Sequence, residues 1–230
     1  MPLQENKIKP IVRSVIAAVN RVRLQCGRDE DLAAERAVYA EIDRIAREPT
    51  PVDVLKTAAS WGLLTACLDL PDASGWAADL ADTQQPSSEF FWLCLARQLP
   101  PEQRERQLRL VPGDRHAQAR WIQGPERIDT CLKDLEEAAS ASRAGTLLEV
   151  LDDTELQLAE NLASQMSSRW IQWWRTTGQE IEASVDGDLL LEQGAAPGPL
   201  LGSAIRAALD VARENGSHAD QLRAALKALG

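Results

Sequence analysis

Three carboxylates stand close together in the second half of the chain, at Asp152, Asp153 and Glu155. Carboxylates in such a cluster can bind a divalent cation or act as a general acid and base. They also directly precede a predicted helix, where a carboxylate accepts hydrogen bonds from the free N–H groups of the first turn. Because no His, Lys or Arg stands beside them, the sequence favours a helix cap. A hydrolase that uses Asp152 and Asp153 is the weaker alternative.

Three tryptophans, Trp170, Trp173 and Trp174, are spaced so that their side chains share one face of a helix. Such a face can stack nucleic-acid bases. It can also pack into a protein core, which is the commoner use of tryptophan. Arg169 and Arg175 flank this face, where they could contact phosphate or lie in solvent.

The segment 186–209, DGDLLLEQGAAPGPLLGSAIRAAL, combines turn residues with an amphipathic run. Its Asp-Gly-Asp start lacks the later carboxylates of a calcium loop, so we interpret it as a turn that leads into a helix. Pro199 suits the first position of a further helix, and Gly198 lets another backbone come close. The free N–H groups and the dipole of that helix form a site for a phosphate-sized anion, with Arg206 two turns further on. An interdomain turn that simply starts a helix is the alternative.

The composition predicts an ordinary soluble protein, with 44% hydrophobic and 26% charged residues. No stretch is apolar enough to span a membrane, and the first residues do not resemble a secretory signal. With two histidines and no C-x-x-C pair, we expect no metal site and a reducing, cytoplasmic location. Buried free thiols are predicted for Cys26, Cys67, Cys94 and Cys131.

The formal net charge of −10 hides an asymmetry along the chain. Residues 1–28 contain six basic residues against Glu5 alone, a net charge of +5, which leaves −15 for the rest. A basic arm of this kind can bind a polyanion locally, or it can dock on an acidic partner domain.

Helix signals dominate the sequence, and strand signals are nearly absent. We predict an all-α fold of about a dozen short helices in two or three subdomains. The Gly124-Pro125 pair is expected to kink or divide the helix that contains it. The subdomains are predicted as a neck-like segment (1–82), a helical body (83–185) and a tail-like segment (186–230). The predicted helical segments are 8–25, 29–49, 50–64, 86–100, 101–111, 114–139, 144–153, 155–166, 168–181, 199–209 and 218–229.

Three motifs in this order resemble the carboxyl-terminal region of class II tRNA nucleotidyltransferases, the CCA-adding enzymes and bacterial poly(A) polymerases. The segment 35–64 is similar to the family's neck, and SRWIQWWRTT at 168–177 is similar to the Trp-containing helix that precedes the family's Gly-Asp-Leu-Leu element. The resemblance covers about residues 30–225. The third motif is carried by Gly187, Asp188, Leu189, Leu190, Gly194, Pro197, Gly198, Pro199, Gly202 and Leu209.

The resemblance implies a fold like the poly(A) polymerase carboxyl-terminal region, in which a neck recognises the incoming nucleotide and a body and tail hold tRNA. The family's catalytic head, which binds Mg²⁺ and ATP or CTP, has no counterpart here. The neck's Glu-Asp-x-x-Arg is also absent, since Glu5-Asn6-x-x-Lys9 keeps only the glutamate. We therefore expect no catalytic residue and no cofactor in this chain.

Two functions are consistent with these features. The first is an RNA-binding, tRNA-anchoring helical portion of such an enzyme, with tRNA or other RNA as partner and a catalytic head in cis or in trans. The alternative is a helical protein–protein interaction module that docks a partner domain and does not bind RNA. The residues expected to contact RNA are Lys7, Lys9, Arg13, Arg21, Arg23, Arg169, Gly198, Arg206 and Arg213.

Overall fold

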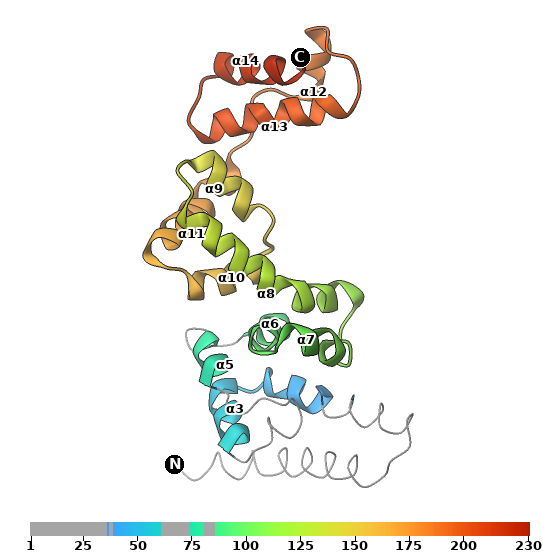
Figure 1. Ribbon diagram of the computed structural model, residues 1–230, viewed down its shortest axis with the longest axis vertical. Coiled ribbons are helices and arrows are strands. Elements are labelled where there is room, and N and C mark those ends of the chain that lie inside the picture. Colours follow the sequence, from blue (N-terminus) through green and yellow to red (C-terminus); the bar gives the residue numbers. More distant parts are fainter. Residues whose placement is uncertain (1–35, 37–38, 61–73, 81–85) are drawn as a thin grey trace. The chain divides into compact units, whose positions relative to one another are not determined.

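The computed structural model describes residues 36, 39–60, 74–80 and 86–230. These residues form 11 α-helices and a short 3-10 helix, and none of them lies in a strand, which confirms the all-α prediction. No helix among the described residues combines the length and apolar character needed to cross a membrane. The chain divides into two compact units, Met1–Ile128 and Asp129–Gly230 (Figure 1). The finer division into neck, body and tail stays a prediction.

The amino-terminal unit is organised around a helix whose central residues are buried. Seven consecutive residues of this helix, 90–96, are buried, because its side chains are apolar all round. Aromatic rings surround it: Trp76 lies 4.8 Å from Phe91, and Trp121 lies 6.2 Å from Trp92, measured between ring centroids. The unit contains a helical stretch at 39–45, α3 (Pro51–Ser60), α5 (Ser74–Asp79), α6 (Ser88–Gln98), α7 (Pro101–Leu108) and the first part of α8 (Arg115–Glu136).

Buried polar groups in this unit are satisfied across helices. Asp43 is almost fully buried and accepts hydrogen bonds from Trp92 Nε1 and Arg47, both at 2.8 Å, and from the Ser88 hydroxyl. The buried Arg104 donates to the backbone carbonyls of Ala96 at 2.9 Å and of two further residues. Because a buried polar group without a partner is costly, these bonds fix the positions of α6 and α7.

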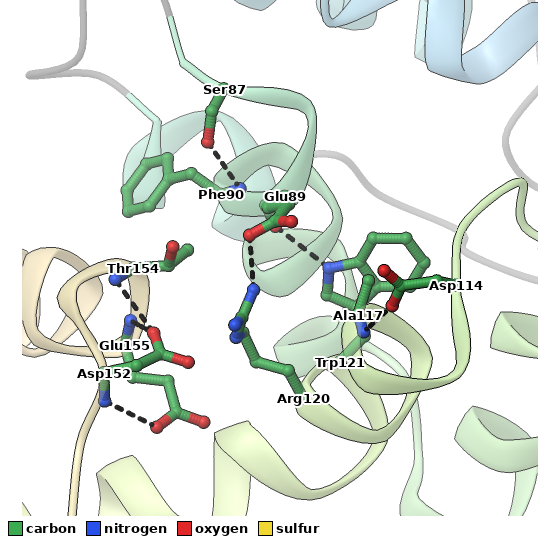
Figure 2. Close-up of polar contacts among 10 residues, drawn as sticks. All are labelled: Ser87, Glu89, Phe90, Asp114, Ala117, Arg120, Trp121, Asp152, Thr154 and Glu155. Atoms are coloured by element: carbon green, nitrogen blue, oxygen red, sulfur yellow. Dashed lines mark hydrogen bonds and ion pairs between the residues drawn. The ribbon is translucent and has the colours of Figure 1, made fainter.

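Several predicted helix boundaries are confirmed. Pro51 begins α3, and Ser87 caps α6 by accepting a hydrogen bond from Phe90 N at 3.1 Å. Asp114 stands just before α8 and accepts from Ala117 N at 2.8 Å (Figure 2). These contacts join residues within three positions of each other, so they follow directly from the local sequence.

The Gly124-Pro125 pair does not divide its helix, contrary to one form of the prediction. Helix α8 runs from Arg115 to Glu136 with Pro125 inside it. Proline removes only one backbone hydrogen bond from the ladder. The apolar residues Trp121, Ile128 and Leu135 recur at helical spacing on either side and are all buried. Packing of this face holds both halves of the helix in one element.

The carboxyl-terminal unit is built from shorter helices and ends in a hairpin. Its last two helices lie side by side (Figure 1). Alanines at 204, 208 and 225 let them approach closely, and Val185 and Leu190 complete this core. The unit contains the end of α8, α9 (Ala141–Leu148), α10 (Asp153–Leu162), α11 (Gln165–Thr176), η1 (Gly178–Glu180), α12 (Gly187–Glu192), α13 (Pro199–Arg213) and α14 (His218–Ala228).

Two of the predicted buried thiols are confirmed. Cys94 and Cys131 are free and buried. Burial raises the pKa of the Cys94 thiol far above its ordinary value, and burial together with the nearby Asp134 raises the pKa of Cys131 to about 11. Cys26 and Cys67 lie outside the described residues.

Candidate functional site

The carboxylate cluster at the start of α10 is a helix cap. Asp152 accepts hydrogen bonds from Thr154 N at 2.9 Å and Glu155 N at 3.0 Å. Glu155 in turn accepts from Asp152 N at 3.2 Å, which completes a capping box (Figure 2). Asp153 points to a different partner, Arg175, at 3.4 Å. Among the described residues, no group of three or more His, Cys, Asp or Glu side chains is arranged to hold a metal ion.

The turn-rich segment before α13 adopts the expected local structure. Asp186 caps α12 by accepting a hydrogen bond from Leu189 N at 2.8 Å. Gly194 follows with φ of 90°, a conformation that favours glycine. Gly198 has φ of 159° and precedes Pro199, the first residue of α13. Residues 196–200 are all exposed.

The start of α13 differs from the other helix starts in this unit. Helices α9, α10, α11, α12 and α14 each begin with a Ser or Asp side chain that accepts a hydrogen bond from a first-turn N–H group. No side chain caps α13 at Gly198. Pro199 has no N–H group and Leu201 N donates to Gly198 O at 3.1 Å, so the Leu200 N–H is the first-turn donor left to solvent, at the positive end of the helix dipole.

The structure places Arg206 and Arg213 against Glu149, a carboxylate that was not predicted to belong to a site. Arg206 Nη1 lies 2.7 Å from both oxygens of Glu149, and Arg213 Nη2 lies 3.0 Å from Glu149 Oε2. The Arg213 side chain is only 3% exposed, whereas Arg206 is 41% exposed. Contact of these two arginines with RNA stays a prediction, and it would compete with Glu149.

The environment of Glu149 shifts its protonation. Partial burial raises its pKa, but hydrogen bonds from Arg206 and Arg213 outweigh this effect, so the pKa lies below its ordinary value. The hydrogen bond to Glu149 likewise raises the pKa of Arg206. The Arg213 guanidinium also lies 5.4 Å from the centre of the Trp174 ring. Arg213 therefore links α13 to Glu149 at the end of α9 and to Trp174 in α11.

The three tryptophans of α11 divide between core and surface. Trp174 is buried against Arg213, as the packing interpretation predicts. Trp170 and Trp173 are partly exposed, and they line a surface depression of about 260 Å³ together with Met166 and Arg169. Met166 was not predicted, although its spacing from Trp170 and Trp173 by four and seven residues places it on the same helical face.

The two arginines that flank the tryptophans have different surroundings. Arg175 pairs with Glu160 at 3.0 Å and with Asp153 at 3.4 Å. Arg169 is exposed and forms no ion pair with any described residue. Of the two, only Arg169 is therefore available to an external anion without breaking an existing contact.

The carboxyl-terminal unit as a whole is acidic. Residues 129–230 contain 17 acidic and eight basic residues, a net charge of −9. Five of the basic residues are held in ion pairs within the unit: Arg143, Arg175, Arg206, Arg213 and Arg223. A polyanion would therefore bind this unit only at restricted places.

The remaining predicted RNA contacts are not tested. Lys7, Lys9, Arg13, Arg21 and Arg23 lie outside the described residues. In the amino-terminal unit, Arg120 pairs with the Glu89 carboxylate, and the Glu89 backbone carbonyl accepts a hydrogen bond from Trp121 Nε1 at 3.1 Å (Figure 2).

Comparison with known proteins gives no identification. No family model, no curated protein and no solved structure matches this chain.

Proposed function

We propose that this chain is an RNA-holding helical region of the tRNA nucleotidyltransferase and poly(A) polymerase type. The observation that carries the proposal is the segment 186–213. Its Gly-Asp-Leu-Leu element forms α12, its glycines form the turn, and its Pro-Gly-Pro element leads into an exposed helix start without a side-chain cap. The motif order that resembles this family is thus matched by local conformations suited to binding an anion.

The chemistry available at this helix start is phosphate binding rather than base recognition. A free first-turn N–H group, here that of Leu200, donates to any phosphate regardless of sequence, and the helix dipole adds to the attraction. Double-stranded RNA is recognised mainly by shape and by backbone contacts, which fits the role of holding tRNA. We propose no catalytic step for this chain, and binding of Mg²⁺ or a nucleoside triphosphate would belong to a separate head domain.

A matched pair of substitutions at Leu200 tests the contact. Leu200 is 57% exposed in the first turn of α13. Leu200→Glu adds a negative charge where the helix dipole favours it, by about 0.3–1 kcal/mol, so the fold is retained. Leu200→Gln removes the apolar side chain without adding charge. We expect Leu200→Glu to weaken binding of a tRNA transcript and to lower the slope of log K against log salt by about 1, with Leu200→Gln close to wild type.

The alternative function predicts another result for the same pair. The acidic carboxyl-terminal unit and its paired arginines favour a protein partner, which would contact exposed apolar side chains such as Leu191, Leu200 and Leu226. If Leu200 serves a protein interface, both substitutions weaken docking of that partner, and neither changes RNA binding. Wild-type protein that shows no preference for tRNA over a duplex RNA at low salt contradicts the RNA-holding proposal.

A further inference from the structure

The depression on α11 has the composition of a small ligand site. Its walls are the indoles of Trp170 and Trp173, the thioether of Met166 and the guanidinium of Arg169. The two indole centroids are 5.9 Å apart with the rings nearly perpendicular. The depression therefore offers aromatic surface for a flat group, with a cation at its border.

Trp170 carries a donor with no acceptor. Its Nε1 atom is buried and has no hydrogen-bond partner. A buried indole N–H normally has an acceptor, because leaving this donor unpaired costs free energy. Because this N–H group is not accessible from the surface, a ligand at the depression would contact the Trp170 ring and not its donor.

The tryptophans of α11 are packed against neighbouring residues that restrict their movement. Gly178 lies so close to the indoles that an added Cβ would stand 2.9 Å from Trp173 Cζ3 and 2.7 Å from Trp174 Cε3. Trp174 itself is buried against Arg213. Rings that are already positioned lose little freedom when a ligand stacks on them.

We propose that this depression binds one unpaired nucleotide, with its base against Trp170 and Trp173 and its phosphate at Arg169. A nucleotide combines the two groups that the site can receive: a flat ring for the indole surface and an anion for Arg169. The depression, at about 260 Å³, is smaller than a pocket for a drug-sized ligand and suits a single base.

The inference deepens the proposed RNA-binding function, because it supplies a contact to a single-stranded nucleotide beside the phosphate contact at α13. It requires neither tRNA nor the start of α13. The same chemistry occurs in a free nucleoside monophosphate and in an unpaired residue of RNA, so both are used as probes.

The test follows the indole N–H signals of ¹⁵N-labelled full-length protein by NMR during titration with AMP, to about 10 mM, a concentration that fills a millimolar site. Trp170→Phe assigns the Trp170 signal. We expect the Trp170 and Trp173 signals to shift with a common saturable dependence on AMP. Arg169→Gln should weaken binding about tenfold, because a charged hydrogen bond is lost. Arg175→Gln, which removes the same charge on the same helix, should leave AMP affinity unchanged.

Further probes separate the parts of the ligand. Adenosine, which lacks the phosphate, should shift both signals but bind about as weakly to wild type as AMP binds to Arg169→Gln. A tetranucleotide RNA that shifts the same signals at lower concentration than AMP identifies RNA as the source of the nucleotide. Equal binding of RNA and AMP identifies the free nucleotide, and both results support the site. Inorganic phosphate that competes as well as AMP, an acidic aromatic peptide that alone shifts the signals, or no shift with any probe overturns the proposal.

The two proposals fail independently. Loss of tRNA binding in Leu200→Glu with an unchanged AMP shift supports both. An AMP shift without any tRNA binding contradicts only the RNA-holding function. Normal tRNA binding without an AMP shift contradicts only the nucleotide site.

Discussion

Arg213 and Glu149 form an ion pair across the carboxyl-terminal unit, with Arg213 Nη2 3.0 Å from Glu149 Oε2. Two other nitrogens of Arg213, Nε and Nη1, are buried without a hydrogen-bond partner, so Glu149 is the carboxylate that offsets this buried charge. Glu149 also pairs with Arg206 at 2.7 Å. One carboxylate thus holds α13 against the end of α9 through two arginines.

Replacing Glu149 should destabilise the protein more than replacing Arg206. Glu149→Gln leaves the Arg213 charge buried and without a counter-charge. We expect a loss of about 2 kcal/mol in the free energy of unfolding, below the 3–5 kcal/mol of fully buried pairs because Glu149 is 40% exposed. Arg206→Gln removes an exposed pair and should cost at most about 1 kcal/mol. Urea unfolding of both variants measures the difference, and equal losses contradict the role assigned to Arg213.

The Glu149 pair should also contribute to acid sensitivity. Because the pKa of Glu149 is lower in the folded protein than its ordinary value of 4.5, the unfolded state binds a proton first as the pH falls. The stabilisation is therefore complete above the ordinary pKa and is lost as the pH drops through the folded value.

Unfolding free energies measured between pH 3 and pH 6 check this sign. Wild type should lose more stability toward acid than Glu149→Gln, which has no titrating group at this position. Other carboxylates with lowered pKa values, such as Asp114 and Asp220, are present in both proteins and cancel in the comparison. Parallel pH profiles would show that Glu149 is not coupled to folding.

Gly145 should be intolerant of a side chain. A Cβ added there would stand 2.8 Å from Arg213 Nε, and the buried Arg213 side chain has little room to move. We expect Gly145→Ala to cost about 1–2 kcal/mol, although alanine is the better helix former. Gly202→Ala is the matched control, since a Cβ at this position in α13 meets nothing within 4 Å. It should stabilise the protein by about 0.5–1 kcal/mol, and thermal unfolding separates the opposite signs.

Asp152 should contribute to stability rather than to chemistry. Asp152→Ala removes the oxygen that accepts from the Thr154 and Glu155 N–H groups, and a cap of this kind is worth about 1 kcal/mol. Mg²⁺ or Ca²⁺ at about 5 mM should leave the melting temperature of wild type unchanged at constant ionic strength. If the metal raises the melting temperature of wild type but not that of Asp152→Ala, the carboxylate cluster binds a metal ion and this prediction is wrong.

Local features were determined by the sequence itself. The all-helical class, the caps at Asp152 and Asp186 and the start of α13 at Pro199 follow from apolar spacing and from hydrogen bonds between residues within three positions. Such interactions form wherever the chain is placed, because their partners are already adjacent. Short helices with weak local signals are harder to predict from the sequence, and α5 (Ser74–Asp79) was not predicted.

Only the tertiary structure decided which of these features are available for function. Arg206 and Arg213 both pair with Glu149, which lies 57 and 64 residues away in the sequence. No local sequence pattern predicts this pairing. Periodicity places Trp170, Trp173 and Trp174 on one face, but packing buries Trp174 and leaves the other two at a surface depression. Burial depends on what the rest of the chain brings against a helix, and long-range contacts determine whether a charged or aromatic side chain can receive a ligand.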